Sequence, residues 1–448
     1  MITALVLIKA ERGMIPAVAS QLGDIEEVTE VFSVTGEYDL VAKIQVKEYE
    51  SLSELVTIRL QKIEGLISTK TMMSFKTYKF VDLEEGFPPV IQRRAERRVP
   101  PHAPEDGRAL TKSILSKLTN SVDLDATEVF SFIDAINQDL VTDVQIAGFL
   151  VALLSKGPTI SEVASIARAM RKNCIPLPLS IDSELTDTCG TGGGFPTFNV
   201  STANAILTAA AGVPVAKHGS RSVSSSSGSA DVLEALGVKV DLGPEQVCSL
   251  IERIGIGFLY APNFHPVMLK VFGPEEQLGI KTIFFTIIGP LINPAGARNH
   301  VMGVYKPELV SMVAEVIAQM NFRHVMVVHG VDGLDEVSLV GKTSVAEIRG
   351  SRIDRYEIAP EDFGLRRCRL EDIAGGDPQF NAQIIKDIFS GKEKGPRRDF
   401  LLLNSAATLY VSGMVSGIKE GLEKAKKILD SGAAMKKLEE LIELSNRI

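Results

Sequence analysis

Short apolar runs that alternate with helical stretches set the strongest limit on the fold of this chain. Four such runs are VPVAKHG (213–219), GIGFLYA (255–261), HVMVVHG (324–330) and FLLLNS (400–405). Runs of this length with few polar residues are typical of strands that are buried on both faces. The pattern therefore predicts an α/β domain over residues 179–448, with a mostly parallel sheet between helices.

The segment before this region contains four amphipathic stretches with the spacing of helices. They are ALTKSILSKL (109–118), DATEVFSFIDAINQ (125–138), VTDVQIAGFLVALLSKG (141–157) and TISEVASIARAMRKN (159–173). Each begins near a Thr, Asp or Ser, whose side chain can accept hydrogen bonds from the free N–H groups of the first helical turn. We expect a helical lobe over residues 108–178.

Residues 1–80 carry a third pattern, in the order β-α-β-β-α-β. Its two helical stretches are GMIPAVASQL (13–22) and YESLSELVTIRLQKI (49–63). This order predicts a ferredoxin-like domain of the α+β class. The domain resembles the ligand-sensing module of the Lrp/AsnC regulators, whose glycine-centred turn corresponds to TGEYD (35–39). The resemblance implies either binding of a small metabolite effector or assembly of the chain into oligomers.

A linker is predicted over residues 81–107, because this segment is rich in proline and has no sustained periodicity. Its run RRAERR (93–98) suits a solvated basic segment or contact with a phosphate-rich partner. The formal net charge of the whole chain is −8, which argues against a nucleic-acid partner.

No apolar run approaches the roughly 20 residues that cross a membrane, so we expect no membrane contact. The N-terminal stretch MITALVLIKAERG has no basic region before its apolar residues and no small-residue cleavage site, which predicts a cytoplasmic protein. The four cysteines lack CxxC spacing, and this predicts reduced thiols instead of disulfides or a zinc site.

The stretch DTCGTGGGFPTFNVST (187–202) is the first candidate site. It lacks the Lys of a Walker loop and the third Gly of a dinucleotide fingerprint. Glycines still let backbone N–H groups approach an anion closely, and NVST places an amide and two hydroxyls where a helix begins. The stretch predicts a loop that holds a phosphorylated ligand, with a glycine-rich packing turn as the alternative.

Two further stretches end predicted strands with polar residues. KHGSRSVSSSSGSADVLEALG (217–237) offers Lys217, Arg221 and serine hydroxyls, which suit a second anion site at the C-terminal end of a strand. HGVDGLDEVS (329–338) contains the adjacent carboxylates Asp335 and Glu336, which suit Mg²⁺ that bridges ligand phosphates. The alternative for the second stretch is an ordinary Asp-Gly turn.

These motifs occur in the order found in the anthranilate phosphoribosyltransferase family. The matching stretches are ALLSKGPTISE (152–162), GTGG with NVST, KHGSRSVSSSSGSADVLEALG, APNFHP (261–266), GPLINPA (289–295), DGLDE and LNSAATLYV (403–411). The chain therefore resembles that family over about 340 residues. The resemblance implies a helical lobe and an α/β lobe of the type shared with nucleoside phosphorylases. It also implies a homodimer formed through the helical lobes, Mg²⁺, and the substrate phosphoribosyl pyrophosphate (PRPP).

The resemblance assigns roles to residues in the matching motifs. The residues implied to bind PRPP are Gly190, Thr191, Gly192, Gly193, Asn199, Ser201, Thr202, Lys217 and Ser225. Those implied to hold the metal are Ser201, Asp335 and Glu336. Those implied to line the acceptor site are His218, Gly219, Ser220, His265 and Glu275. No covalent nucleophile or catalytic base is assigned, because an amine nitrogen is already nucleophilic.

The chain departs from the family pattern at several of these positions. Gly194 stands where the family has Asp, Ser220 where it has Asn, and Glu275 where it has the Arg that pairs with the anthranilate carboxylate. The stretch IFFTIIG (283–289) has one extra residue, with Thr286 in place of Asn. Since a carboxylate at 275 would repel a carboxylate ligand, these exchanges argue against anthranilate and for another amine or a nitrogen heterocycle. The alternatives are a nucleoside-phosphorylase-like enzyme and a non-catalytic relative that binds nucleic acid.

Overall fold

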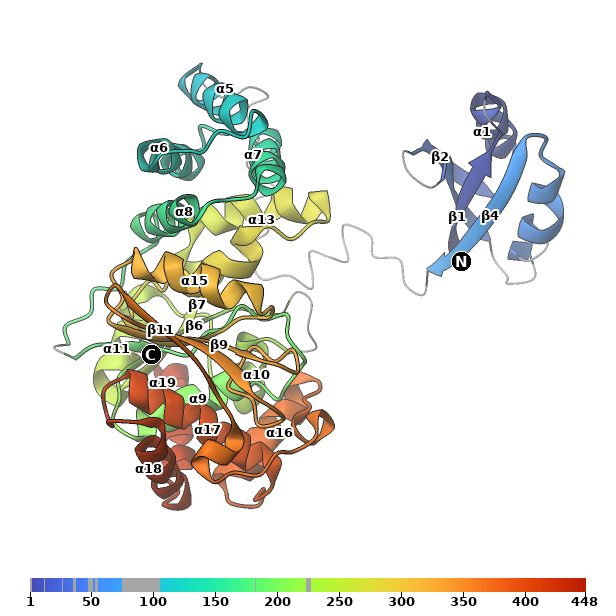
Figure 1. Ribbon diagram of the computed structural model, residues 1–448. Coiled ribbons are helices and arrows are strands. Elements are labelled where there is room, and N and C mark those ends of the chain that lie inside the picture. Colours follow the sequence, from blue (N-terminus) through green and yellow to red (C-terminus); the bar gives the residue numbers. More distant parts are fainter. Residues whose placement is uncertain are drawn as a thin grey trace. The chain divides into compact units, whose positions relative to one another are not determined.

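The computed structural model divides the chain into two compact units, Met1–Val99 and Pro100–Ile448, which we describe separately (Figure 1). The structure describes residues 2–11, 13–25, 27–34, 38–46, 51–52, 55–74, 105–181, 183–222 and 227–448. The predicted basic run 93–98 and the glycine of the predicted turn at 35–39 lie outside these residues. In the described part, no helix has the length and apolar character needed to cross a membrane.

The N-terminal unit is a four-stranded antiparallel sheet with the order β2-β3-β1-β4. Its elements are β1 (Ile2–Ala10), α1 (Ile15–Gly23), β2 (Val28–Ser33), β3 (Leu40–Val46), η1 (Leu55–Arg59), η2 (Leu60–Lys62) and β4 (Leu66–Ser74). The order is that of a ferredoxin-like domain, as predicted. The second helical segment is irregular, because η1 is a π-helix and η2 is a 3₁₀-helix.

Four helices open the second unit, as the sequence predicts. They are α5 (Glu105–Thr119), α6 (Ala126–Asn137), α7 (Asp143–Lys156) and α8 (Ile160–Lys172). Asp125, Thr142 and Thr159 each accept a hydrogen bond from the backbone of the third helical residue, whose side chain binds back to the cap. Helices α6 and α7 also pack on α13 (Pro266–Leu278), and α8 packs on α15 (Glu308–Ala318).

A seven-stranded sheet with the order β11-β10-β9-β8-β5-β6-β7 forms the centre of this unit. Its strands are β5 (Thr186–Asp187), β6 (Val215–Gly219), β7 (Ile256–Tyr260), β8 (Asn299–Gly303), β9 (His324–Gly330), β10 (Thr343–Arg349) and β11 (Arg352–Ile358). All neighbours from β9 to β7 are parallel, while β10 is antiparallel to both β9 and β11. The sheet is therefore mostly parallel, as expected.

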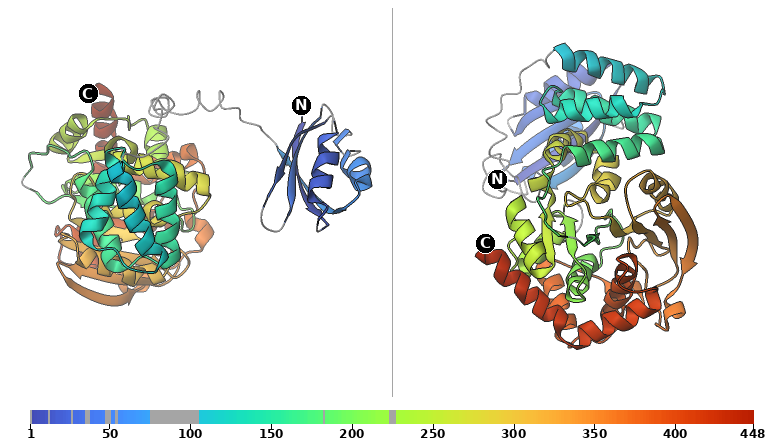
Figure 2. Two further views of the ribbon diagram at one scale, coloured as in Figure 1. Left: turned by 90° about the horizontal axis from the view of Figure 1, so that it is seen from above. Right: turned by 90° about the vertical axis from the view of Figure 1, so that its left-hand side faces the viewer.

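Helices cover both faces of this sheet, as the views in Figures 1 and 2 show. Helix α15 and the group α5–α8 lie on one side, and α9 and α16–α19 lie on the other. The remaining helices of the unit are α9 (Val200–Ala210), α10 (Ser229–Leu236), α11 (Pro244–Ile254), α12 (Ala261–Phe264), α14 (Gly289–Leu291), α16 (Pro378–Phe389), α17 (Pro396–Val411), α18 (Ile418–Asp430) and α19 (Ala433–Arg447). Three short segments are the π-helix η3 (Phe284–Ile288) and the 3₁₀-helices η4 (Pro360–Phe363) and η5 (Leu370–Ile373).

Strand β9 shows why the central runs are apolar without alternation. Met326 and Val328 pack in the core with α9 and α17, whereas Val325 and Val327 pack in the core shared with the helical group. Successive side chains of a strand point to opposite faces, so both sets must be apolar when helices cover both faces.

The prediction of a strand at FLLLNS (400–405) is wrong, because this run lies inside helix α17. Phe400 through Leu403 are all buried, with no more than 2% of any of these residues exposed. A helix that is buried on all sides has no polar stripe, so its sequence cannot be told from that of a buried strand by periodicity alone.

Removal of the Glu162 carboxylate is expected to destabilise the helical group strongly. The carboxylate is fully buried and accepts hydrogen bonds from the backbone N–H groups of Leu124 and Thr159 and from the Lys156 ammonium group. Glu162→Ala leaves these donors without this acceptor, and we expect the free energy of unfolding to fall by about 3 kcal/mol. Urea denaturation measures the change, and the exposed Glu439→Ala should stay within about 0.5 kcal/mol of wild type. Equal effects of the two substitutions would contradict this assignment.

Candidate functional site

The C-terminal ends of the parallel strands meet at one edge of the sheet, and the predicted motifs follow these ends. The glycine loop follows β5, KHG is the end of β6, APNFHP follows β7, and DGLDE follows β9. Open α/β sheets bind ligands at this edge. The topology therefore brings together motifs that are up to about 140 residues apart in the sequence.

The Asp187 carboxylate joins the glycine loop, the end of β6 and the GPLINPA stretch. It is fully buried at the end of β5, and its Oδ1 accepts hydrogen bonds from the backbone N–H groups of Thr188 (2.7 Å), Cys189 (3.2 Å) and His218 (3.2 Å). Its Oδ2 accepts a hydrogen bond from the Asn293 amide at 2.7 Å. Neither Asp187 nor Asn293 is among the predicted site residues, although Asp187 begins the candidate stretch 187–202 and Asn293 lies in the matching motif GPLINPA.

The glycine loop packs against the residues that follow β8. The Thr191 N–H donates to the Gly303 carbonyl (2.9 Å), and the Thr191 hydroxyl accepts from the Tyr305 N–H (3.2 Å). A Cβ atom on Gly303 would lie 1.4 Å from the Asp335 carbonyl oxygen, so only glycine fits at this position. Gly190 lies close to both, because its Cβ would be 3.2 Å from the Gly303 oxygen and 3.3 Å from Asp335 Oδ2.

The Asp335 carboxylate occupies the space that a side chain at Gly194 would need. A Cβ atom on Gly194 would lie 2.5 Å from Asp335 Oδ1 and 2.8 Å from the Gly333 carbonyl oxygen. The Gly192 N–H donates to the same carboxylate, and Gly192 and Gly193 both have positive φ (65° and 86°). The absence of an acid at 194 thus has a steric reason in this chain, because Asp335 already fills the loop.

The N-terminus of α9 follows the glycine loop and carries NVST. Asn199 caps the helix in a left-handed conformation (φ 56°), and its amide binds Ser227 and Asn381. The Thr202 hydroxyl is buried and has no hydrogen-bond partner in the structure, while Ser201 is half-buried. A buried, unpartnered hydroxyl in the first turn of a helix fits a phosphate ligand.

Asp335 and Glu336 are adjacent carboxylates in a desolvated environment. Burial raises the pKa of both carboxyl groups, and repulsion from Asp335 raises that of Glu336 further. Glu336 Oε1 accepts from the Thr197 hydroxyl at 3.2 Å, whereas Oε2 is buried and has no hydrogen-bond partner among the residues that the structure describes. Across the described residues, no cluster of three or more His, Cys, Asp or Glu side chains could hold a metal. A pair of acids with an unpartnered oxygen fits Mg²⁺ that takes its other ligands from phosphates and water.

Strand β6 places Lys217 and His218 at the same edge, and both are buried. His218 Nε2 lies 3.1 Å from His265 Nε2, and the two rings pack edge to face. Burial lowers the pKa of His218 to about 4, an effect that Asp187 opposes and the positive charge of Lys217 strengthens. Burial also lowers the pKa of His265 well below its usual range. Both imidazoles are therefore neutral at neutral pH, and one donates its Nε2 hydrogen to the other.

The serine-rich loop after β6 is held at its two ends by one acid. The Asp231 carboxylate accepts from the N–H groups of Ser222 (3.0 Å) and Gly228 (2.9 Å). Arg221, which the sequence analysis placed in an anion site, forms a bidentate ion pair with Glu234 instead (2.7 and 2.6 Å). Of the other predicted residues, Ser225 lies outside the described part of the chain, Ser220 is exposed, and Gly219 packs tightly against Ser229.

The exchanged positions on the acceptor side meet at Thr282. Glu275 is buried and its carboxylate accepts from the Thr282 N–H, while the Thr286 hydroxyl donates to the Thr282 carbonyl (2.9 Å). Burial raises the pKa of the Glu275 carboxyl, although its hydrogen bonds to Thr282 oppose the shift. The π-helix η3 lies within IFFTIIG, the stretch in which the motif comparison predicts one extra residue. The described contacts of Glu275 thus join it to Thr282 and not to the histidine pair.

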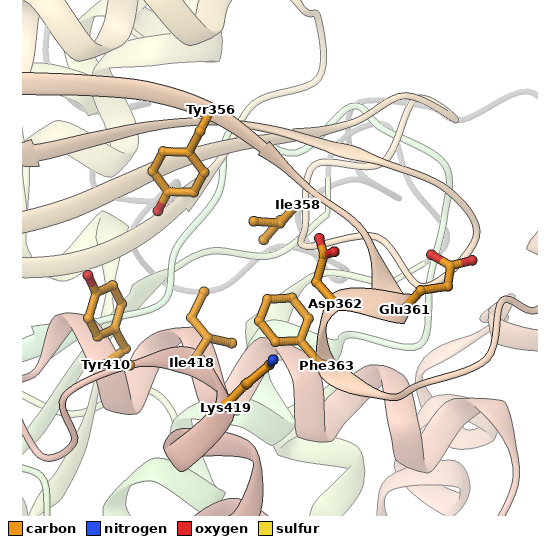
Figure 3. A pocket seen from close by; sticks show the side chains of 9 residues that line it. Tyr356, Ile358, Glu361, Asp362, Phe363, Tyr410, Ile418 and Lys419 are labelled. Carbon is orange, nitrogen blue, oxygen red and sulfur yellow. The ribbon is translucent and has the colours of Figure 1, made fainter.

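A separate open cavity of about 640 Å³ lies between β11, η4 and the start of α18 (Figure 3). Figure 3 shows the hydroxyls of Tyr356 and Tyr410 turned toward each other, and both donate to the Glu347 carboxylate (2.6 and 2.9 Å). None of the residues that line this cavity belongs to the predicted site.

Comparison with known proteins identifies the family. Residues 182–435 match the a/b domain of the glycosyl transferase family, residues 112–174 match its helical bundle domain, and residues 3–82 match the Lrp/AsnC ligand binding domain. The chain is 48% identical to the anthranilate phosphoribosyltransferase of Acetivibrio thermocellus over 338 residues, which cover 75% of this chain and 97% of that protein. The chain belongs to the anthranilate phosphoribosyltransferase family. The predicted family, fold class and N-terminal module are thereby confirmed.

Other members of the family agree in sequence and in structure. The enzyme of Methanobrevibacter smithii is 46% identical over 75% of this chain and 100% of its own length. The crystal structure of the Thermus thermophilus enzyme is 40% identical and superposes with a TM-score of 0.70 over 74% of this chain and 99% of its own. The Saccharomyces cerevisiae enzyme in complex with PRPP and Mg is 29% identical, with a TM-score of 0.69 over 76% and 99% of the two chains.

The Glu336 carboxylate gives a test of the metal site that does not depend on turnover. Because its pKa is raised in the folded chain, the folded state loses stability as the pH rises through that raised pKa. We expect Glu336→Gln to melt at a higher temperature than wild type at pH 8 without Mg²⁺. Added MgCl₂ should raise the melting temperature of wild type and of the exposed control Glu439→Gln, but not that of Glu336→Gln. The same Mg²⁺ response in all three proteins, measured by scanning fluorimetry, would contradict the assignment.

Proposed function

We propose that this chain transfers the phosphoribosyl group of PRPP to an amine and releases pyrophosphate. The observation that carries the proposal is a pair of buried, unpartnered groups at one sheet edge: the Thr202 hydroxyl, which suits a phosphate, and Glu336 Oε2, which suits a cation. Thr197 links them, because its hydroxyl binds Glu336 and it lies three residues before α9 begins. A ligand with both phosphate and bound Mg²⁺ satisfies both groups.

The residues of the edge have distinct roles in this reaction. The amine nitrogen forms a bond to C1 of the ribose while the bond from C1 to the pyrophosphate oxygen breaks, and the nitrogen then loses one proton. Negative charge grows on the leaving pyrophosphate, and we assign its stabilisation to Lys217 and to the N–H groups of Gly190–Gly193. The start of α9, with Ser201 and Thr202, binds phosphate oxygens.

Mg²⁺ suits the Asp335 and Glu336 carboxylates, with Ser201 near it, and when bound it neutralises the charge that develops on the phosphate oxygens. The two carboxylates must be ionised to hold it. Because burial raises the pKa of both carboxyl groups and repulsion from Asp335 raises that of Glu336 further, we expect the apparent affinity for Mg²⁺ to fall as the pH is lowered.

The acceptor side combines two neutral imidazoles with the Glu275 carboxylate, which already accepts a hydrogen bond from Thr282. His218 and His265 are neutral, and the ring that donates its Nε2 hydrogen to the other keeps an Nδ1 that can accept a hydrogen bond from an uncharged amine. At position 275, where the family pattern has an Arg for the anthranilate carboxylate, Glu275 is bound to Thr282. We propose an aromatic amine whose recognition does not need a guanidinium at this position, with Gly219 and Ser220 at the rim of its site.

A pair of isosteric acceptors tests this proposal. We expect pyrophosphate release from PRPP and Mg²⁺ with 2-aminobenzamide, which replaces the carboxylate of anthranilate by a neutral amide, at a kcat/KM at least equal to that with anthranilate. A preference for anthranilate of tenfold or more, roughly 1.4 kcal/mol, would show that the carboxylate is recognised elsewhere. Phosphorolysis of a nucleoside without any use of PRPP would favour a phosphorylase instead.

The N-terminal module and the helical group extend this proposal to partners. We propose that the module binds a small metabolite, since its match is to a ligand binding domain. Calorimetry of the full chain with a panel of amino acids tests this, and oligomerisation is the simpler account if none binds. Helix α7 exposes Val144, Val151 and Leu154 on one side, which supports a homodimer formed through the helical group.

A further inference from the structure

The tail motif LNSAATLYV contains no predicted site residue, but its buried Asn404 side chain contacts the backbone beside Glu336. Asn404 lies on α17 with 4% of its surface exposed. Its Oδ1 accepts a hydrogen bond from the Val337 N–H, and its Nδ2 donates to the Val337 carbonyl, both at 3.0 Å. Val337 follows Glu336 directly, so this amide binds both backbone groups of the residue next to the proposed metal ligand.

The same side of α17 is joined to the helix that begins the proposed phosphate site. The Thr408 hydroxyl donates to the Asn404 carbonyl (3.1 Å) and accepts from the Asn204 amide (2.8 Å). Asn204 lies on α9, two residues after Thr202, and its Oδ1 accepts from the Thr208 hydroxyl (3.0 Å). All of these side chains are buried, so each bond is protected from competition by water.

We propose that Asn404 is a positioning residue, which fixes the Asp335 and Glu336 carboxylates relative to the start of α9 through Thr408 and Asn204. This inference rests on the proposed function. The two ends of the network carry the groups that would bind the cation and the phosphate, and a single ligand must reach both. If the Asn404 amide is lost, the backbone N–H and carbonyl groups of Val337 lose their hydrogen bonds to it. The distance from the Asp335 and Glu336 carboxylates to the phosphate site is then no longer fixed.

The chain provides isosteric variants and a matched control. Asn404→Asp keeps the acceptor for the Val337 N–H but removes the donor to the Val337 carbonyl. Thr408→Val keeps the shape of the side chain but breaks the link to Asn204 without changing any contact of Val337. Ser405→Ala is the control, because Ser405 is the next residue on α17, is fully buried, and has a hydroxyl without a hydrogen-bond partner in the structure.

Binding of Mn²⁺, a spectroscopic substitute for Mg²⁺, is measured for each variant by electron paramagnetic resonance in the presence of PRPP. We expect Asn404→Asp to weaken Mn²⁺ binding on the order of tenfold and to raise the Mg²⁺ concentration for half-maximal rate by a similar factor. The KM for the amine should not change, and Ser405→Ala should match wild type. Thr408→Val should weaken Mn²⁺ binding in the presence of PRPP more than in its absence.

The result that would overturn the proposal is a lower melting temperature and a lower kcat in Asn404→Asp with unchanged Mn²⁺ affinity, since that describes a purely structural role. If Asn404→Asp does not fold, Thr408→Val decides by the same comparison, and unchanged Mn²⁺ affinity with PRPP would overturn the proposal. A failure of the proposed function would give a different result from a failure of this inference. Mn²⁺ binding would still be weakened in Asn404→Asp, but wild type would release no pyrophosphate with any amine.

Discussion

The candidate site depends on the buried carboxylate of Asp187. Among the residues that the structure describes, no cationic side chain binds this carboxylate directly, and it accepts hydrogen bonds from three backbone N–H groups and the Asn293 amide. Hydrogen bonds to an ionised acceptor are stronger than neutral ones, and a buried carboxylate that lost them would be costly. The glycine loop, the end of β6 and the GPLINPA stretch therefore hold fixed positions around the Asp187 carboxylate. The positions of the other site residues depend on these three segments.

The acceptor side illustrates how exchanges of residues can be related through structure. Glu275 and Thr286, which the motif comparison aligns with Arg and Asn of the family, both bind the backbone of Thr282. The π-helix η3 begins at Phe284 in the same segment. At the donor side, Gly194 leaves room for the Asp335 carboxylate. The exchanges on the acceptor side and on the donor side thus have local steric and hydrogen-bonding reasons. In the sequence alone, the same exchanges look unrelated.

Much of the fold could be predicted from the sequence, because its determinants are local. The caps at Asp125, Thr142 and Thr159 mark helix starts, and the apolar run of β9 marks a strand covered on both faces. The run at 400–405 was wrongly predicted to be a strand, because a fully buried helix has no polar stripe that would reveal its helical period. Contacts between residues that are separated in the sequence could not be predicted. Arg221 pairs with Glu234 in the following helix α10, and Asn404 binds Val337, which is 67 residues away. The residues of the glycine loop could be found because their chemistry is continuous in the sequence.

We expect the glycine loop, the start of α9 and the Asp335–Glu336 pair to hold one PRPP molecule with Mg²⁺. A crystal structure of the full chain grown with PRPP and MgCl₂ tests this arrangement. It should show pyrophosphate density against Gly190–Gly193, a phosphate group within hydrogen-bond distance of the Thr202 hydroxyl, and a metal ion at Glu336 Oε2. PRPP bound at another place on the chain, with the Thr202 hydroxyl and Glu336 Oε2 still without partners, would contradict it.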